Sequence, residues 1–156
     1  MKKVLFSLLA LLFVSNLSMA QNKKNLGIGI VFGAPAGITM KYWNEPSEAI
    51  DIAVGWSLKK STYYYLHADY LYHNFKLLKP YATKQMLGEF PVYAGIGIRT
   101  RFGDGDDELG VRIPIGVTYL FASLPLDVFG EIAPALNLLP DTKMYLEVSI
   151  GTRYYF

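Results

Sequence analysis

The chain of 156 residues is 52% hydrophobic and 15% aromatic, and it contains no cysteine. It carries 15 basic and 13 acidic side chains, and the basic excess disappears once Lys2 and Lys3 are removed with the leader described next. A formally neutral domain lacks the basic surface on which nucleic-acid binding depends, so we expect no nucleic-acid partner. Without cysteine we expect neither disulfide bonds nor an acylated N-terminal cysteine.

The first twenty residues have the pattern of a secretory signal peptide. Two lysines precede an apolar segment over residues 4–14, and Ser18-Met19-Ala20 matches a small-x-small cleavage site. The apolar segment is shorter than the roughly 20 residues that a transmembrane helix needs. We therefore predict a signal peptide over residues 1–20 and one exported domain over residues 21–156.

The exported domain consists of extended runs separated by turn residues, with almost no helical periodicity. The eight predicted strands are Leu26 to Gly33, Gly37 to Trp43, Ala49 to Leu58, Thr62 to Phe75, Phe90 to Phe102, Leu109 to Phe121, Leu126 to Leu138, and Lys143 to Phe156. The longer connection from Lys76 to Glu89 is expected to be an ordered loop, because Pro80 interrupts any helix. Pro114 and Pro134 lie inside strands and lack a ladder donor, so we expect a bulge or ladder break at both.

Each run alternates between two kinds of side chain. One face is free of charge and mostly apolar, as at Ile28 and Ile30 in the first run and Ile96 and Ile98 in the fifth. The opposite faces carry glycines and the ionisable residues Lys41, Asp51, His67, Asp69, Arg99, Arg101, Arg112, Asp127, Glu131, Glu147 and Arg153. Besides the histidine, five of these are basic and five acidic, so we predict that they form an ion network.

Two closed architectures share this alternation. A soluble lipocalin-like carrier would turn the apolar face inward, whereas a transmembrane barrel turns it toward lipid. Ten charges in an apolar ligand cavity would carry a severe desolvation cost, but inside a membrane barrel they pair with one another and with water. A closed barrel also leaves no unpaired strand edge in lipid. The pattern therefore favours an all-β fold, an eight-stranded antiparallel up-and-down transmembrane β-barrel, over the soluble carrier.

Aromatic residues fall where such strands would cross the membrane interfaces, as in the girdles of outer-membrane barrels. They are Tyr42, Trp56, Tyr64, Tyr70, Tyr72, Phe102, Tyr119, Phe121, Tyr154 and Phe156. The final Gly-Thr-Arg-Tyr-Tyr-Phe, with Tyr154 and Phe156 on one face, resembles the C-terminal assembly signal of these proteins. An even strand number puts both termini on the periplasmic side. The expected surface loops are then residues 34–36, 59–61, 103–108 and 139–142.

Longer stretches carry a family resemblance. They are Gly-Ile-Thr-Met-Lys-Tyr-Trp (37–43), Tyr-Leu-His-Ala-Asp-Tyr-Leu-Tyr-His-Asn-Phe (65–75), Leu-Gly-Val-Arg-Ile-Pro-Ile-Gly-Val-Thr-Tyr-Leu-Phe (109–121) and Pro-Leu-Asp-Val-Phe-Gly-Glu-Ile-Ala-Pro (125–134). With the C-terminus, they resemble a family of small, functionally uncharacterised Gram-negative outer-membrane β-barrels of the OmpA/OmpX size class. The resemblance implies a porin-like fold in the outer membrane and no chemistry. The expected partners are outer-membrane lipid and lipopolysaccharide, with the barrel assembly machinery and periplasmic chaperones during biogenesis of a monomer.

One constellation suggests catalysis. His67 and Asp69 share an inner face that Ser149 and Glu131 could also reach, and a lipid A deacylase-like hydrolase would use a serine activated by histidine with an acidic orienting group. Acyl chains need access to that nucleophile, and a charge-filled interior is a poor place for it. The hydrolase therefore stays an alternative to a structural or interaction protein without catalysis.

A second constellation suggests cation binding. The 103–108 loop carries Asp104, Asp106, Asp107 and Glu108, and oxygen-rich loops can hold Ca²⁺ or Mg²⁺. The spacing differs from known calcium loops, and Asp and Gly favour turns, so a solvated acidic turn is the preferred interpretation and no cofactor is expected. Because eight strands enclose an interior that side chains fill, we also expect no transport of large solutes.

Overall fold

The computed structural model describes residues 24–57, 63–79, 88–103 and 107–156. The predicted signal peptide, the 59–61 loop, most of the 76–89 connection, and Asp104 and Asp106 lie outside these residues. Within the described residues, no helix is both long enough and apolar enough to cross a membrane.

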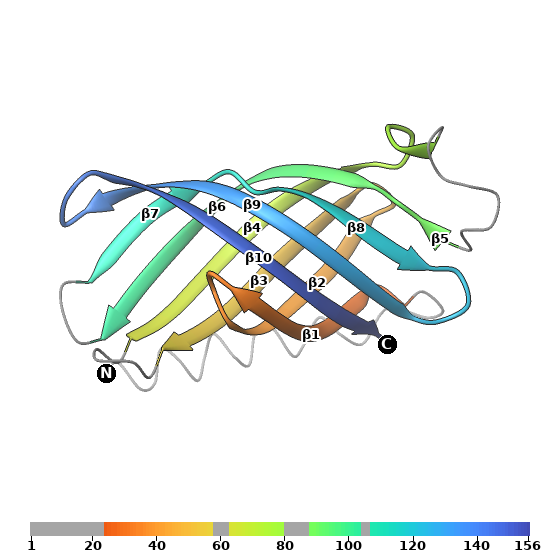
Figure 1. The fold of residues 1–156 in the computed structure, drawn as a ribbon, viewed down its shortest axis with the longest axis horizontal. Helices are drawn as coiled ribbons and strands as arrows, with labels where there is room; N and C mark the ends of the chain where they lie inside the picture. Colours follow the sequence, from red (N-terminus) through yellow and green to blue (C-terminus); the bar gives the residue numbers. More distant parts are fainter. Residues whose placement is uncertain (1–23, 58–62, 80–87, 104–106) are drawn as a thin grey trace.

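The described residues form one antiparallel sheet that closes on itself. Its strands are β1 (Leu26–Gly33), β2 (Gly37–Glu45), β3 (Glu48–Ser57), β4 (Tyr63–Asn74), β5 (Gly88–Glu89), β6 (Val92–Gly103), β7 (Glu108–Arg112), β8 (Ile115–Phe121), β9 (Leu126–Leu139) and β10 (Lys143–Tyr155). The order β10-β1-β2-β3-β4-β6-β7-β9, with β9 paired back to β10, is a ring of eight strands. Figure 1 shows these strands tilted around a common axis, with the β9–β10 connection at one end and the C-terminus toward the other.

One of the eight predicted runs is divided by a proline, and another is preceded by a short extra strand on the far side of a proline. β5 and β6 are separated at Pro91, and β7 and β8 at Pro114, yet the pairing register between the two runs is the same on both sides of each gap. Thr118 donates its N–H to the Pro91 carbonyl (3.0 Å), and Gly95 donates to the Pro114 carbonyl (2.9 Å). Proline cannot donate the return bond. The break predicted at Pro114 is confirmed. Because β5 also forms, in the part of the 76–89 connection that was expected to be a loop, the described residues contain ten strands instead of eight.

The break predicted at Pro134 is wrong. Pro134 lies inside β9 and pairs with Leu146 of β10 in an unbroken register. Its carbonyl accepts a hydrogen bond from the N–H of Ile113, which lies in the gap between β7 and β8 (2.9 Å). Pro134 therefore lacks its N–H opposite the gap between β7 and β8, where the neighbouring run is already interrupted. The pairing of β9 with β10 is unaffected, so β9 continues through Pro134.

The two faces of the ring differ as the alternation predicts. Along β4, Tyr65, His67, Asp69, Leu71 and His73 are buried, and the residues between them are partly or largely exposed. Across the ring the exposed outward residues are mostly apolar or aromatic, with polar residues such as Asn44, Glu45 and Lys143 at strand ends, and the buried inward residues include most of the charges. The fold is therefore polar inside and apolar outside.

Ring closure requires a close approach between β1 and β10, which pair from Gly27↔Tyr155 to Gly33↔Ser149. A Cβ atom added at Gly29 would overlap the backbone carbonyl oxygen of Thr152 in β10. A Cβ atom added at Gly130 of β9 would meet no atom within 4 Å. Glycine is therefore required for close strand contact at Gly29 and not at Gly130.

We expect Gly29→Ala to lower the free energy of unfolding by about 1–3 kcal/mol, the usual cost of overpacking, because β10 must move away from β1. Gly130→Ala is the matched control and should be neutral or slightly stabilising, since alanine suits a strand better than glycine. Urea unfolding of both variants in detergent micelles provides the measurement. Equal stability of the two variants would contradict the close approach at the closing seam.

Candidate functional site

The interior is organised around three buried arginines that come from three strands: Arg153 of β10, Arg112 of β7 and Arg99 of β6. Each guanidinium contacts carboxylates from other strands. Arginine suits this role because its planar guanidinium offers several donors at fixed angles. The three groups together link the interior from the end that carries the C-terminus toward the opposite end.

Arg153 lies nearest the C-terminal end. Its Nη2 atom lies 2.8 Å from Asp51 Oδ1, and its Nη1 atom lies 3.2 Å from Asp127 Oδ2. Its Nε atom donates to Thr39 Oγ1 (3.1 Å), and the guanidinium carbon lies 3.8 Å from the centroid of the Phe129 ring. Arg153 therefore connects β10 with β2, β3 and β9.

Arg112 occupies the middle of the interior and is 1% exposed. It donates to Glu131 Oε1 and to His67 Nδ1, and its Nε and Nη1 atoms lie 3.6 Å from Glu147 and Asp69 respectively. Glu131 and Glu147 both belong to the ion network that the sequence predicts. Arg112 therefore joins β7 to β4, β9 and β10.

Arg99 lies toward the other end. Its Nε atom lies 3.2 Å from Glu147 Oε1, its Nη2 atom lies 3.2 Å from Glu108 Oε2, and its Nη1 atom donates to Asn137 Oδ1 (2.9 Å). Arg101, two residues further along β6, lies 2.7 Å from Glu108 Oε1 and is the partly exposed member of the group. Two arginines thus share one carboxylate here.

Two sequence interpretations need correction. Lys41 is buried, but it has no carboxylate within 4 Å among the described residues: its Nζ atom lies 3.0 Å from His73 Nε2 and against the rings of Trp43 and Tyr93. Glu108 belongs to β7 and the interior rather than to a solvated acidic turn, because the strand begins one residue earlier than expected. Glu108 adds a sixth carboxylate to the five predicted, so the interior charges of the described residues do not balance.

The neutral partners of the network were not singled out from the sequence. Tyr65 donates to Glu147 and Tyr155 donates to Asp127, both at 2.7 Å, and Tyr93 donates to Glu131 at 2.9 Å. Asn137 donates to Glu108 at 2.7 Å. The available signal was position, because each of these residues occupies an inward place in its strand's alternation. Their hydroxyl and amide groups are ambiguous in sequence, since they occur on either face.

The geometry around His67 bears on both catalysis and metal binding. Asp51, His67 and Asp69 each offer a ligand atom within 4.8 Å of the others. Arginine is always a donor, so its contact at His67 Nδ1 leaves the ring proton on Nε2, which faces Asp51 Oδ2 and Asp69 Oδ2 at 3.7 Å. In this tautomer Nε2 has no lone pair for a cation. Among the described residues, His67 also makes no hydrogen bond to Ser149, the contact that a hydrolase would need.

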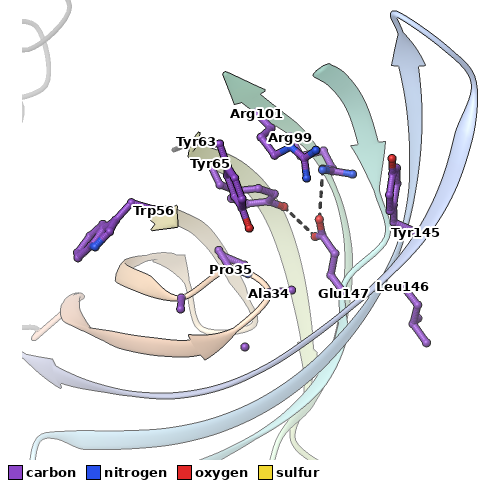
Figure 2. Close-up of a pocket in the computed structure, with 12 residues that line it drawn as sticks. Ala34, Pro35, Trp56, Tyr63, Tyr65, Arg99, Arg101, Tyr145, Leu146 and Glu147 are labelled. Atoms are coloured by element: carbon purple, nitrogen blue, oxygen red, sulfur yellow. Dashed lines mark hydrogen bonds and ion pairs between the residues drawn. The ribbon is translucent and has the colours of Figure 1, made fainter. Parts of the chain in front are cut away.

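A cavity of about 630 Å³ lies at the end of the interior where the β1–β2 and β9–β10 connections are. Figure 2 shows Tyr63, Tyr65 and Arg101 along one side, Tyr145 on the other and Arg99 between Tyr65 and Tyr145, while Trp56 and Leu146 point away. Glu147 lies at the bottom, bonded to Tyr65 and Arg99. The paired side chains below it close the interior.

Comparison with known proteins supports the architecture. No family model matches the chain, and no curated protein matches its sequence. The crystal structure of the N-terminal β-barrel domain of Pseudomonas aeruginosa OprF is similar, with a TM-score of 0.56 and 13% sequence identity over 84% of this chain and 95% of that one. Similarity at this identity concerns the fold alone, and it supports a β-barrel.

Arg112→Ala should lower the free energy of unfolding by about 3–5 kcal/mol, because it leaves buried carboxylates without their cation. Arg101→Ala is the matched control: it removes a partly exposed guanidinium and should cost about 1 kcal/mol or less. Denaturant unfolding followed by tryptophan fluorescence measures both. An Arg112→Ala protein as stable as the wild type would contradict the role of this arginine in the network.

Proposed function

We propose that the chain is a small integral outer-membrane β-barrel of a Gram-negative cell, with a structural or interaction role and no transport of large solutes. The observation that carries the proposal is the inverted distribution of polarity. Ile96, Met144 and Leu146 point outward and are 65%, 78% and 66% exposed, while Lys41, Arg112 and Arg153 are 0–1% exposed inside. Lipid around the ring explains why so much apolar surface is left uncovered.

Strand dimensions and aromatic placement support the membrane interpretation. The strands of the ring, leaving aside the interrupted β7–β8 run, have 8 to 14 residues, close to the 9–11 that a tilted transmembrane strand needs. Outward aromatic residues form a row at one end, where Tyr64 pairs with Trp56 and Phe102. Tyr72, Tyr154 and Phe156 lie toward the other end, and all three are exposed. Two aromatic rows are typical of the two membrane interfaces.

The closed interior argues against a pore for large solutes. Arg153, Arg112 and Arg99 with their partners bridge the ring at successive levels, and the side chains are mostly buried against one another. An eight-stranded ring is narrow enough for side chains to fill. The same interior disfavours a soluble lipocalin-like carrier, which would need an apolar lining.

The remaining expectations belong to this proposal. The C-terminal strand pairs with β1, and the Phe156 N–H donates to the Leu26 carbonyl (2.9 Å), so the segment with Tyr154 and Phe156 helps close the ring. This placement agrees with its reading as an assembly signal for the barrel assembly machinery, after delivery by periplasmic chaperones. Lipid and lipopolysaccharide would surround a monomer. The proposal includes no catalytic activity, and a lipid A deacylase-like hydrolase is its alternative.

The first test concerns the outward face. Ile96→Arg should lower the free energy of unfolding in a lipid bilayer by about 2–4 kcal/mol, because it places a charge in the hydrocarbon region. Met144→Arg is the control near a strand end, where the cost should be about 0–1 kcal/mol. Refolding into phospholipid vesicles with denaturant titration measures both. Equal, small effects at the two positions would count against lipid around the ring.

The second test concerns location. The full chain expressed in a Gram-negative host should fractionate with the outer membrane, and its gel mobility should change on boiling because a folded barrel resists detergent denaturation. Recovery in the aqueous fraction without detergent would favour the soluble carrier. Altered lipid A acylation that depends on His67, tested with His67→Ala, would revive the hydrolase.

A further inference from the structure

We infer that the cavity at the β1–β2 end binds a neutral saccharide, with one sugar ring packed against Tyr63 and Tyr145. The space between Tyr65 and Tyr145 is already taken by the Arg99 guanidinium, whose carbon lies 5.4 Å and 5.1 Å from their ring centroids. A volume of about 630 Å³ lies within the range of small-molecule sites, roughly 300–1,000 Å³. The proposed function places the end of the ring that carries this cavity outside the cell, so the natural source of the saccharide rests on that proposal. Binding itself rests only on the cavity.

The charges of the cavity are satisfied internally. Arg99 pairs with Glu147 and Glu108, and Arg101 pairs with Glu108, at 2.7–3.2 Å. A strongly anionic ligand would have to displace one of these carboxylates, and a cationic ligand would have to displace an arginine. A neutral ligand requires neither exchange.

Hydrogen-bonding groups are nevertheless left over. Neither the Tyr63 nor the Tyr145 hydroxyl bonds to another described residue. Arg101 uses one guanidinium nitrogen on Glu108, and its side chain is 37% exposed. These groups donate, and the phenol oxygens also accept. A purely apolar ligand would leave them without partners, at a cost in binding free energy.

Flat and apolar surfaces complete the cavity. The guanidinium carbons of Arg101 and Arg99 lie 4.8 Å and 5.1 Å from the ring centroids of Tyr63 and Tyr145, which holds both rings in place before a ligand arrives. Ala34, Pro35 and Ala36 supply an apolar wall. A pyranose matches this combination, because its C–H faces are apolar and its rim carries hydroxyl groups that both donate and accept.

The test is calorimetric titration of the folded full chain, in amine-oxide micelles that carry no sugar, with lactose, maltose and cellobiose. We expect saturable binding of at least one disaccharide that is unchanged between about 50 and 500 mM NaCl, because salt screens charge and leaves neutral contacts intact. Binding that weakens with salt, as for a charged ligand, would overturn the inference. No binding of any of the three disaccharides would overturn it unless the glycolipid described below binds.

Matched variants locate the site. Tyr145→Ala should weaken binding about tenfold, and Tyr63→Phe and Tyr145→Phe, which keep the ring, several-fold through one lost hydrogen bond. Tyr64→Phe is the control, because Tyr64 lies on the outer face between Tyr63 and Tyr65 and stacks on Phe102. Heat-modifiable mobility checks that each variant folds. Binding that survives Tyr145→Ala in folded protein would overturn the inference.

Offering lactose both in solution and on a lipid distinguishes a free saccharide from a glycolipid headgroup as the natural ligand. Binding of lactose in solution assigns a free saccharide, whereas binding of lactosylceramide in a phosphatidylcholine bilayer, without binding of lactose, assigns a glycolipid headgroup. If neither the disaccharides in solution nor lactosylceramide in the bilayer binds, the inference is overturned. The proposed function is then still supported if the protein fractionates with the outer membrane. A chain recovered as a soluble protein overturns the proposed function, and the micelle titration then decides saccharide binding separately.

Discussion

Closure of the sheet is the constraint on which the rest of the structure depends. A ring of eight strands encloses an interior narrow enough for side chains to fill most of it. Most charges in that space pair, because an isolated buried charge costs several kcal/mol. Arg153, Arg112 and Arg99 each contact carboxylates from more than one strand. The interior network is thus a consequence of closure.

The contacts of Arg112 lie beside an interruption of the backbone ladder. Pro91, Pro114 and Pro134 each withhold a donor from the ladders that flank the β7–β8 run. Arg112 is the last residue of β7, directly before that gap, and its side chain contacts β4, β9 and β10. Side-chain ion pairs therefore connect the interrupted run to strands across the interior as well as to its neighbours.

The strand positions and their faces could be predicted, because alternation along a strand is a local property. Ile28 and Ile30 alternate with Gly27 and Gly29 regardless of what the rest of the chain does. The division at Pro114 was also local, since proline lacks an N–H wherever it occurs. At Pro134 the same rule failed, because the cost depended on the neighbouring strand, which the sequence does not identify.

Sequence alone determined that one face carries lipid-compatible side chains and the other carries ionisable groups, since both follow from a period of two residues. Only the tertiary structure decided the pairs. Glu108 joined the interior because Arg99 and Arg101 lie beside it across the β6–β7 register, and Lys41 was surrounded by His73, Trp43 and Tyr93 instead of a carboxylate. Which charges meet depends on register and closure, and these arise from contacts between residues that are distant in the chain.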